Sequence, residues 1–169
     1  FAVVMAAVMG FMVEQKESYD DTRNRAQYQQ SMRAVISMVS REIRSTGADP
    51  TDAGVVALGT ANSTMFQCAM DLNGDGDASD QDPDESILYV YDPVNGELLR
   101  NDGAFAMVIL RDLTNLQFRY YDADGVELTA VPLNASDRDL VRFIQIDMSG
   151  EASHAESVDY TSRSALRNI

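Results

Sequence analysis

The sequence predicts an α+β fold in which a long N-terminal helix packs on a head made of mostly antiparallel β-sheet. Three observations lead to this prediction. Residues 1–13 carry no charge, and residues 14–46 contain neither proline nor glycine. From Pro50 onward, short alternating segments separated by turn residues replace the helical pattern. We therefore divide the chain into a helix at residues 1–46 and a globular β-rich head at residues 47–169.

The first segment, residues 1–13, consists almost entirely of apolar side chains. As a helix it would be about 20 Å long, which is shorter than the roughly 30 Å hydrocarbon core of a bilayer. It could be a buried core helix, the core of a secretory signal, or the later part of a longer apolar helix. No positively charged region precedes it, as a signal would require. The segments that follow favour the third interpretation.

Residues 14–46 are expected to continue this helix as an amphipathic stalk. The first dozen residues are polar nearly all round, and the later part carries an apolar stripe at helical spacing. Gly47 and Pro50 mark the end of the helix. Two shorter helices with a break near Glu14 are the alternative. The apolar stripe is expected to dock on the head, and it consists of Met32, Val35, Ile36, Val39 and Ile43.

The head is expected to form one sheet that this stripe of the helix covers. The Asn95-Gly96 pair indicates a tight turn, so that the strand after it returns antiparallel to the strand before it. Alternating or short apolar segments predict strands at residues 64–70, 86–92, 97–100, 107–110, 115–121, 126–131, 140–148 and 157–166.

An acidic loop at residues 71–82, DLNGDGDASDQD, has the spacing of a calcium-binding loop. Oxygen-bearing side chains recur at alternate positions with a glycine, Gly76, at the sixth, and calcium takes six to eight oxygen ligands. The expected ligands are Asp71, Asn73, Asp75 and Asp82, with the carbonyl of Asp77.

Other residues of this loop have smaller expected roles. Ser79 or Asp80 could add an oxygen or a water, and Asp84 and Glu85 are expected only to add negative potential. The alternative for the whole segment is a solvated acidic turn without metal.

Composition excludes several classes of function. The chain has 13 Lys and Arg against 27 Asp and Glu, a net charge of −14, which argues against a nucleic-acid partner. Cys68 is the single cysteine, so neither an internal disulfide nor a Cys/His zinc site can form. The single histidine, His154, lies in a polar stretch and is expected to be solvated. No catalytic motif is present, and we do not expect an enzyme.

Several stretches resemble the minor pilins and pseudopilins of the PilW and PulJ type. The stalk from Tyr19 to Gln29, with Met32 and Arg33, ends in Arg-Glu-Ile-Arg-Ser-Thr-Gly at residues 41–47, which is similar to the family pattern R-[DE]-[IL]-R-x-[AT]-G. An acidic DLNGDGD stretch before a Tyr-x-Tyr-Asp strand, at residues 71–77 and 89–92, and the Arg167-Asn168 pair near the end also resemble this group.

The resemblance implies a pilin-like fold and an N-terminal helix that packs against other pilin subunits. The family begins at a processed, N-methylated phenylalanine followed by an early glutamate, and this chain has Phe1 without that glutamate. Either Phe1 is the mature start of a subunit that lacks the acid, or about twelve residues precede it, which would give a segment long enough to span a bilayer. Contacts with lipid and then with the filament core are expected from Phe1, Val4, Val8, Phe11 and Met12.

The function that the resemblance implies is a structural subunit of a type IV pilus or of a type II secretion pseudopilus. The subunit would reside in the bacterial inner membrane before assembly and in an extracellular or periplasmic filament afterwards. A minor subunit that primes assembly or occupies the tip is expected, with calcium stabilising the head. A major pilin of its own filament and a membrane-anchored, calcium-dependent adhesin are the alternatives.

Overall fold

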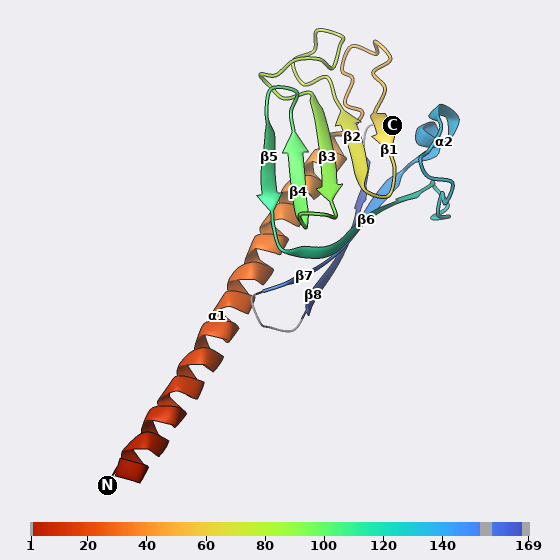
Figure 1. Ribbon diagram of the computed structural model, residues 1–169. Coiled ribbons are helices and arrows are strands. Elements are labelled where there is room, and N and C mark those ends of the chain that lie inside the picture. Colours follow the sequence, from red (N-terminus) through yellow and green to blue (C-terminus); the bar gives the residue numbers. More distant parts are fainter. Residues whose placement is uncertain (1, 153–156, 167–169) are drawn as a thin grey trace.

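The computed structural model describes residues 2–152 and 157–166, in which one long helix leads into a β-rich head (Figure 1). Helix α1 (Ala2–Ser45) runs without a break near Glu14, so the prediction of a single helix is confirmed. Its N-terminal half projects away from the head, and its C-terminal half lies along it. The helix ends where Gly47 takes a φ of 77°, a value that glycine adopts without strain.

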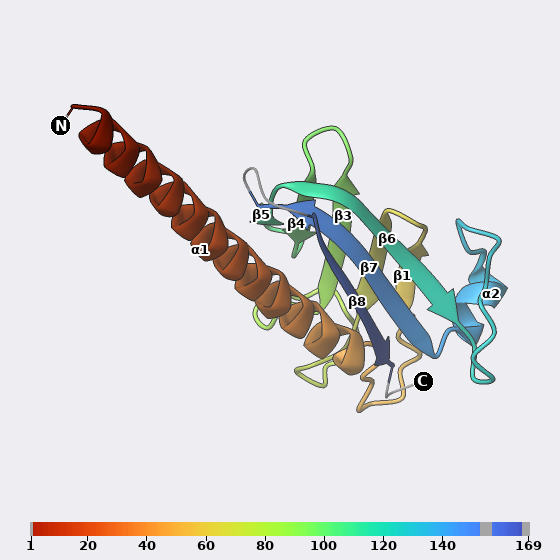
Figure 2. The same cartoon turned by 90° about the horizontal axis from the view of Figure 1, so that it is seen from below.

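The head contains two antiparallel sheets where one was predicted. The first sheet has the order β1-β2-β3-β4-β5 and the second the order β6-β7-β8 (Figure 2). The strands of the first sheet are β1 (Leu58–Ala61), β2 (Met65–Ala69), β3 (Ser86–Asp92), β4 (Glu97–Asn101) and β5 (Ala106–Leu110). Those of the second sheet are β6 (Leu113–Tyr121), β7 (Phe143–Glu151) and β8 (Ser157–Ala165).

The two sheets share one core in which aromatic rings meet. Phe66 on β2 stacks on Tyr89 of β3 at 5.1 Å between ring centroids and meets Phe118 of β6 edge-on at 4.7 Å. Rings in such offset and edge-on arrangements attract one another beyond the burial of their area. Because Phe66 belongs to the first sheet and Phe118 to the second, this group of rings joins the sheets.

Two predicted strands differ from the structure. The segment at residues 126–131 forms no strand, because Asp122 holds a turn by accepting hydrogen bonds from the amides of Asp124 and Val126 at 3.0 and 2.8 Å, and only Glu127 bridges back to Tyr121. The segment predicted from residue 140 begins as a strand at Phe143, because the short helix α2 (Ala135–Leu140), capped by Asn134, occupies the preceding residues. Strand β1 and helix α2 were not predicted.

Helix α1 docks on the head through its apolar stripe, mainly against β8 and also against β5 and β7. Further along the helix toward its N-terminus, the Tyr28 hydroxyl donates to the carbonyls of Arg111 and Asp112, at 3.1 and 3.0 Å. Burial and the nearby charge of Asp112 raise the pKa of Tyr28 to about 12, so the hydroxyl keeps its proton. The stripe residues Met32, Val35, Ile36, Val39 and Ile43 are between 0 and 8% exposed.

Candidate metal-binding loop and the polar contacts that hold it

The acidic loop between β2 and β3 is built around the carboxylate of Asp71, which is only 1% exposed. Asp71 accepts hydrogen bonds from the amides of Gly74 and Gly76, at 2.5 and 3.0 Å, and from the hydroxyl of Thr51 at 3.4 Å. Gly76, the sixth residue of the loop, takes a φ of 94°, a value that glycine adopts without strain. Asp71 therefore holds the backbone of the loop in place from its buried side.

Glu85, the residue directly before β3, closes the loop from its other end. Its side chain is fully buried and accepts hydrogen bonds from the amides of Leu72 and Asn73 at 2.8 and 3.2 Å and from the amide of Asp80 at 3.4 Å. The expectation that Glu85 only adds negative potential is therefore wrong. A buried carboxylate with three amide donors is satisfied, and here it pins both ends of the loop to the head.

Three carboxylates converge at the surface of the loop, and we call Asp75, Asp77 and Asp80 the acidic rim. One oxygen of each lies within 4.8 Å of the others. The side-chain amide nitrogen of Asn73 donates to Asp75 at 3.2 Å and to Asp80 at 2.6 Å. Loss of hydration, followed by the charges of Asp75, Glu85 and Asp77, raises the pKa of Asp80. The rim is thus a concentration of negative charge that a cation would stabilise.

The predicted ligands are only partly brought together. The carboxylates of Asp75 and Asp77 lie in the rim with that of Asp80, whereas the sequence predicted the main-chain carbonyl of Asp77 as its ligand atom. Asp71 lies beneath the loop with its oxygens bound to amides, and Asn73 turns its nitrogen, not its oxygen, toward the rim. Asp82 is exposed and lies outside the group of three. The donor set that the structure offers is three carboxylates, which suits a hard cation such as calcium.

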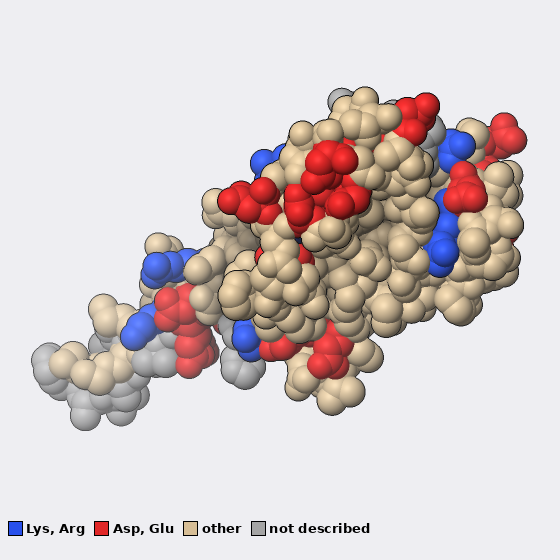
Figure 3. All heavy atoms as spheres, turned by 90° about the horizontal axis from the view of Figure 1, so that it is seen from above, with Lys and Arg blue, Asp and Glu red and all other residues tan. Residues whose placement is uncertain are grey.

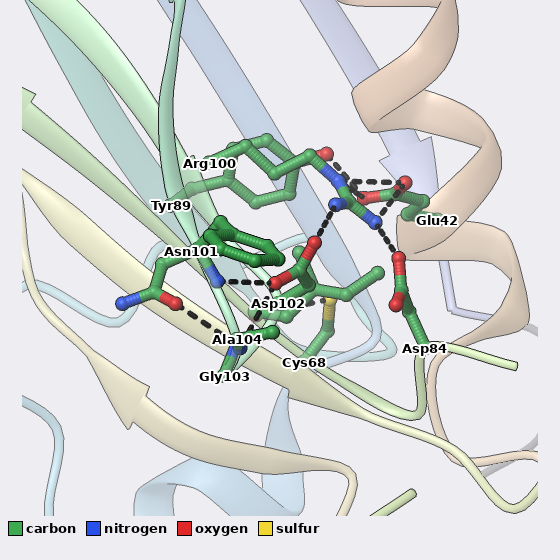
Figure 4. Close-up of polar contacts among 11 residues, drawn as sticks. Glu42, Cys68, Asp84, Tyr89, Arg100, Asn101, Asp102, Gly103 and Ala104 are labelled. Carbon is green, nitrogen blue, oxygen red and sulfur yellow. Dashed lines mark hydrogen bonds and ion pairs between the residues drawn. The ribbon is translucent and has the colours of Figure 1, made fainter. Parts of the chain in front are cut away.

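Beside the loop, Arg100 on β4 joins three segments of the chain through its guanidinium (Figure 4). It contacts Glu42 of α1 at 3.2 Å, Asp84 shortly after the acidic loop at 2.9 Å, and Asp102 after β4 at 3.4 Å. Burial alone would lower the pKa of Arg100, but the hydrogen bond to Asp84 and the charge of Glu42 outweigh it, so the pKa is raised. The cation is fixed between its three carboxylates.

Tyr89 completes this cluster by donating a short hydrogen bond from its hydroxyl to Glu42. Burial first, and then the charge of Glu42, raise the pKa of Tyr89, so it remains a donor. The neighbouring Cys68 is buried, and burial raises the pKa of its thiol to about 12, which makes it an unreactive core residue. The cluster is a structural link between α1 and the head.

The N-terminal half of α1 exposes its apolar side chains. Phe11 is 61% and Met12 is 64% exposed, and Met5 and Met9 are 50% and 62% exposed. Of the other predicted packing residues, Phe1 lies outside the described residues, and Val4 and Val8 belong to α1 with side chains that are not described. Within the described residues, the hydropathy of every helix falls short of what a membrane-crossing segment requires.

His154 and the Arg167-Asn168 pair also lie outside the described residues. Comparison of the sequence with models of known protein families gives no match, and comparison with curated proteins gives no significant similarity.

The roles of Glu85, Glu42 and Arg100 were not predicted from the sequence. One signal points to Arg100: residues 45–99 contain 11 Asp and Glu but neither Lys nor Arg, so Arg100 is the first cation available to that acidic stretch. No comparable signal marks Glu85, because its burial depends on how the loop folds back onto β3.

Proposed function

We propose that this chain is a structural subunit of a type IV pilin-like filament, of the minor kind that primes assembly or occupies the tip. The N-terminal half of α1 packs among the helices of neighbouring subunits, and the head is displayed on the outside. Before assembly, the same apolar segment anchors the subunit in the inner membrane.

The observation that carries this proposal is the uneven exposure of one continuous helix. The C-terminal half of α1 is covered by the head, whereas Met9, Phe11 and Met12 are more than 60% exposed on the projecting half. Apolar side chains gathered at one end of a projecting helix gain free energy when a lipid or a protein surface covers them. The resemblance of the stalk and of the acidic loop to minor pilins supports a filament as that surface.

The filament role is tested with the full chain in a cell that assembles such filaments. The double variant Phe11→Asp with Met12→Asp should fold but disappear from the filament fraction released by shearing, because charges cannot be buried between packed helices. The matched control is Phe105→Asp, which changes an apolar residue of the head that is 77% exposed and should leave recovery unchanged. Unchanged recovery of the double variant would contradict the proposal.

We further propose that the acidic rim binds calcium and stabilises the head. The support is chemical: three carboxylates with oxygens within 4.8 Å of one another and no ion pair to any of them in the described part of the chain. Asp71 and Glu85 shape the loop beneath them. The side-chain N–H group of Asn73 already donates to Asp75 and Asp80, so calcium would have to displace that group from the rim.

Thermal unfolding tests the calcium site. A calcium concentration about tenfold above the dissociation constant should stabilise the head by about 1.4 kcal/mol and raise the unfolding temperature by roughly 3–6 °C relative to a chelator. The variant Asp77→Asn with Asp80→Asn should lose this increase. The variant Asp122→Asn with Asp124→Asn changes the acidic turn after β6 and should keep it. An unfolding temperature that does not respond to calcium would contradict this part of the proposal and leave the filament role untouched.

A further inference from the structure

The outer side of the first sheet carries a row of apolar side chains. The row crosses four neighbouring strands, each member lies directly opposite the next, and the members are Met65, Val90, Leu99 and Val108. Val90 and Leu99 alternate with buried core residues of their own strands, so the row points away from the core, and all four members are partly exposed. Three strand spacings give it a length of about 14 Å. We call these four residues the apolar row.

The second sheet shows that such a row is unusual on a side that faces water. An antiparallel sheet with one face on a core normally carries polar side chains on its other face. Four outward positions in the middle of β6 and β7 follow this rule, namely Gln117, Arg119, Gln145 and Asp147. Helix α1 lies on the inner side of the first sheet, where Glu42 reaches Arg100, and Figure 1 shows β3 and β4 with α1 behind them. The described part of the chain therefore leaves the apolar row in contact with solvent.

The two long sides of the apolar row differ in charge. On one side, the next outward residues of β3 and β4 are Asp92 and Glu97, which lie opposite each other. A hydrogen bond from the Asn95 side chain contributes most to lowering the pKa of Asp92, so this carboxyl stays ionised. Glu97 pairs with Arg111, whereas Asp92 has no ion pair among the residues that the structure describes. On the other side, the next outward residues are uncharged, namely Gln67, Leu88 and Asn101.

A second copy of the chain does not match this surface. The chain has 27 Asp and Glu against 13 Lys and Arg, and acidic side chains gather on the head in the view of Figure 3. Two heads brought face to face would add one negative potential to another, which opposes association. An apolar surface beside an unpaired carboxylate fits a partner that combines apolar side chains with cations.

We propose that the apolar row binds another protein through an apolar stripe that is flanked on one side by Lys or Arg. The partner's apolar side chains cover the row, and its cations face Asp92 and Glu97. A helix suits this surface, because apolar residues spaced three and four apart form a stripe of about 11–16 Å over two to three turns, which matches the length of the row. The inference does not rest on the filament role, because the apolar row and the projecting half of α1 are separate surfaces of the chain.

Binding of model peptides to the purified full chain tests the proposal, with fluorescence anisotropy as the measurement. The first peptide is a helix of about 18 residues with a leucine stripe flanked on one side by lysine. The second has glutamate in place of lysine, and the third has serine in place of leucine. The first peptide should bind at least about tenfold more tightly than either of the others. Equal affinity for the first peptide and either of the others would contradict the proposed chemistry of the partner.

Variants of the head assign this binding to the apolar row. Val90→Thr with Leu99→Thr keeps residues that favour strands but makes the centre of the row polar, and it should weaken binding of the first peptide by about tenfold. Asp92→Asn with Glu97→Gln should weaken it by about threefold and make it less sensitive to salt. Val126→Thr is the control, because Val126 is 59% exposed in the turn after β6, and it should leave binding unchanged. Thermal unfolding of each variant verifies that the head is folded.

Three outcomes would overturn the proposal. The first is unchanged binding in the Val90→Thr and Leu99→Thr variant. The second is self-association of the parent that this variant abolishes in sedimentation, which would identify a second copy as the occupant. The third is flotation of the parent with neutral lipid vesicles that the same variant abolishes, which would identify a membrane. The variant Phe11→Asp with Met12→Asp should bind the first peptide as the parent does, so failure of the filament role and failure of this inference are distinguished.

Discussion

The two halves of α1 belong to one helix but have different environments. In the C-terminal half, the side chains of Met32, Val39 and Ile43 are at most 1% exposed, because the head covers them. In the N-terminal half, Met9 and Phe11 are more than 60% exposed. Both halves are apolar on at least one side, so hydrophobicity alone does not decide burial. The comparison teaches that the head covers only half of the helix and leaves apolar side chains of the other half exposed.

The largest expected effect comes from removing a side chain of the docked half. Ile43→Ala should lower the free energy of unfolding of the head by about 2–5 kcal/mol, because it leaves a cavity under a fully buried residue. Phe11→Ala on the projecting half should change it by less than about 0.5 kcal/mol. Chemical denaturation of both variants measures the difference. Equal losses of stability in the two variants would contradict the conclusion that the head covers only the C-terminal half of the helix.

The next effect concerns the ion cluster that ties the docked half to the acidic loop. Arg100→Met should cost about 2–3 kcal/mol, because Glu42, Asp84 and Asp102 lose a cation whose side chain is only 12% exposed. Arg111→Met is the control, since Arg111 is 67% exposed and its ion pair within the described residues is with Glu97 alone, and it should cost about 0–1 kcal/mol. A similar loss for both would show that the cluster contributes no more than a surface pair.

A smaller effect is expected at the contact between Tyr28 of α1 and Gly150 of β7. A Cβ at Gly150 of β7 would lie 2.0 Å from the Tyr28 hydroxyl and 2.8 Å from the carbonyl oxygen of Asp112. Gly150→Ala should therefore destabilise the head by about 1–3 kcal/mol and raise amide hydrogen exchange around Tyr28. Adding Tyr28→Phe removes the shortest of the three close contacts, although the ring carbon Cζ still lies 2.8 Å from the added Cβ, and should recover part of the loss. No recovery would place the strain at the Asp112 carbonyl and the ring carbon of residue 28 instead of at the hydroxyl.

The smallest effect concerns the turn after the docked half and depends on pH. Hydrogen bonds from the amides of Ala53 and Val55, with Gly54 and Thr51 also contributing, lower the pKa of Asp49 to about 2. A lowered pKa stabilises the fold above the unfolded value of about 3.9, and this contribution is lost as the pH falls toward 2. The stability difference between the parent and Asp49→Ala should be constant above pH 5 and shrink below pH 4. A difference independent of pH would contradict this assignment.

The elements of the fold were largely predictable because their signals are local. The stalk lacks helix breakers, Asn95-Gly96 turns β3 into β4, and alternation marks β3 and β6. The strand predictions failed where a local side-chain contact stabilises another structure. Asp122 closes a turn in place of a strand at residues 126–131, and Asn134 caps helix α2 ahead of β7. Such capping contacts join residues that are close in the sequence. They are nevertheless hard to predict, because Asp and Asn are common in loops of every kind.

The candidate site was predictable in composition and not in arrangement. The spacing of Asp71, Asn73 and Asp75 indicated a calcium loop, and the structure uses Asp71 as a support and makes the rim from Asp75, Asp77 and Asp80. Which carboxylate faces the solvent and which faces the backbone depends on the path of the loop. Glu85 lies 14 positions after Asp71 in the sequence. It fixes that path because its carboxylate accepts hydrogen bonds from amides at both ends of the loop.

The sequence by itself determined a long helix with an apolar start, an amphipathic later part, and a β-rich acidic head, because periodicity and charge are properties of neighbouring residues. Tertiary structure decided the division of the head into two sheets, the burial of Glu85 beneath the acidic rim, and the meeting of Glu42, Asp84 and Arg100. These contacts join residues far apart in the chain, and their geometry follows from packing and from the need to satisfy buried polar groups.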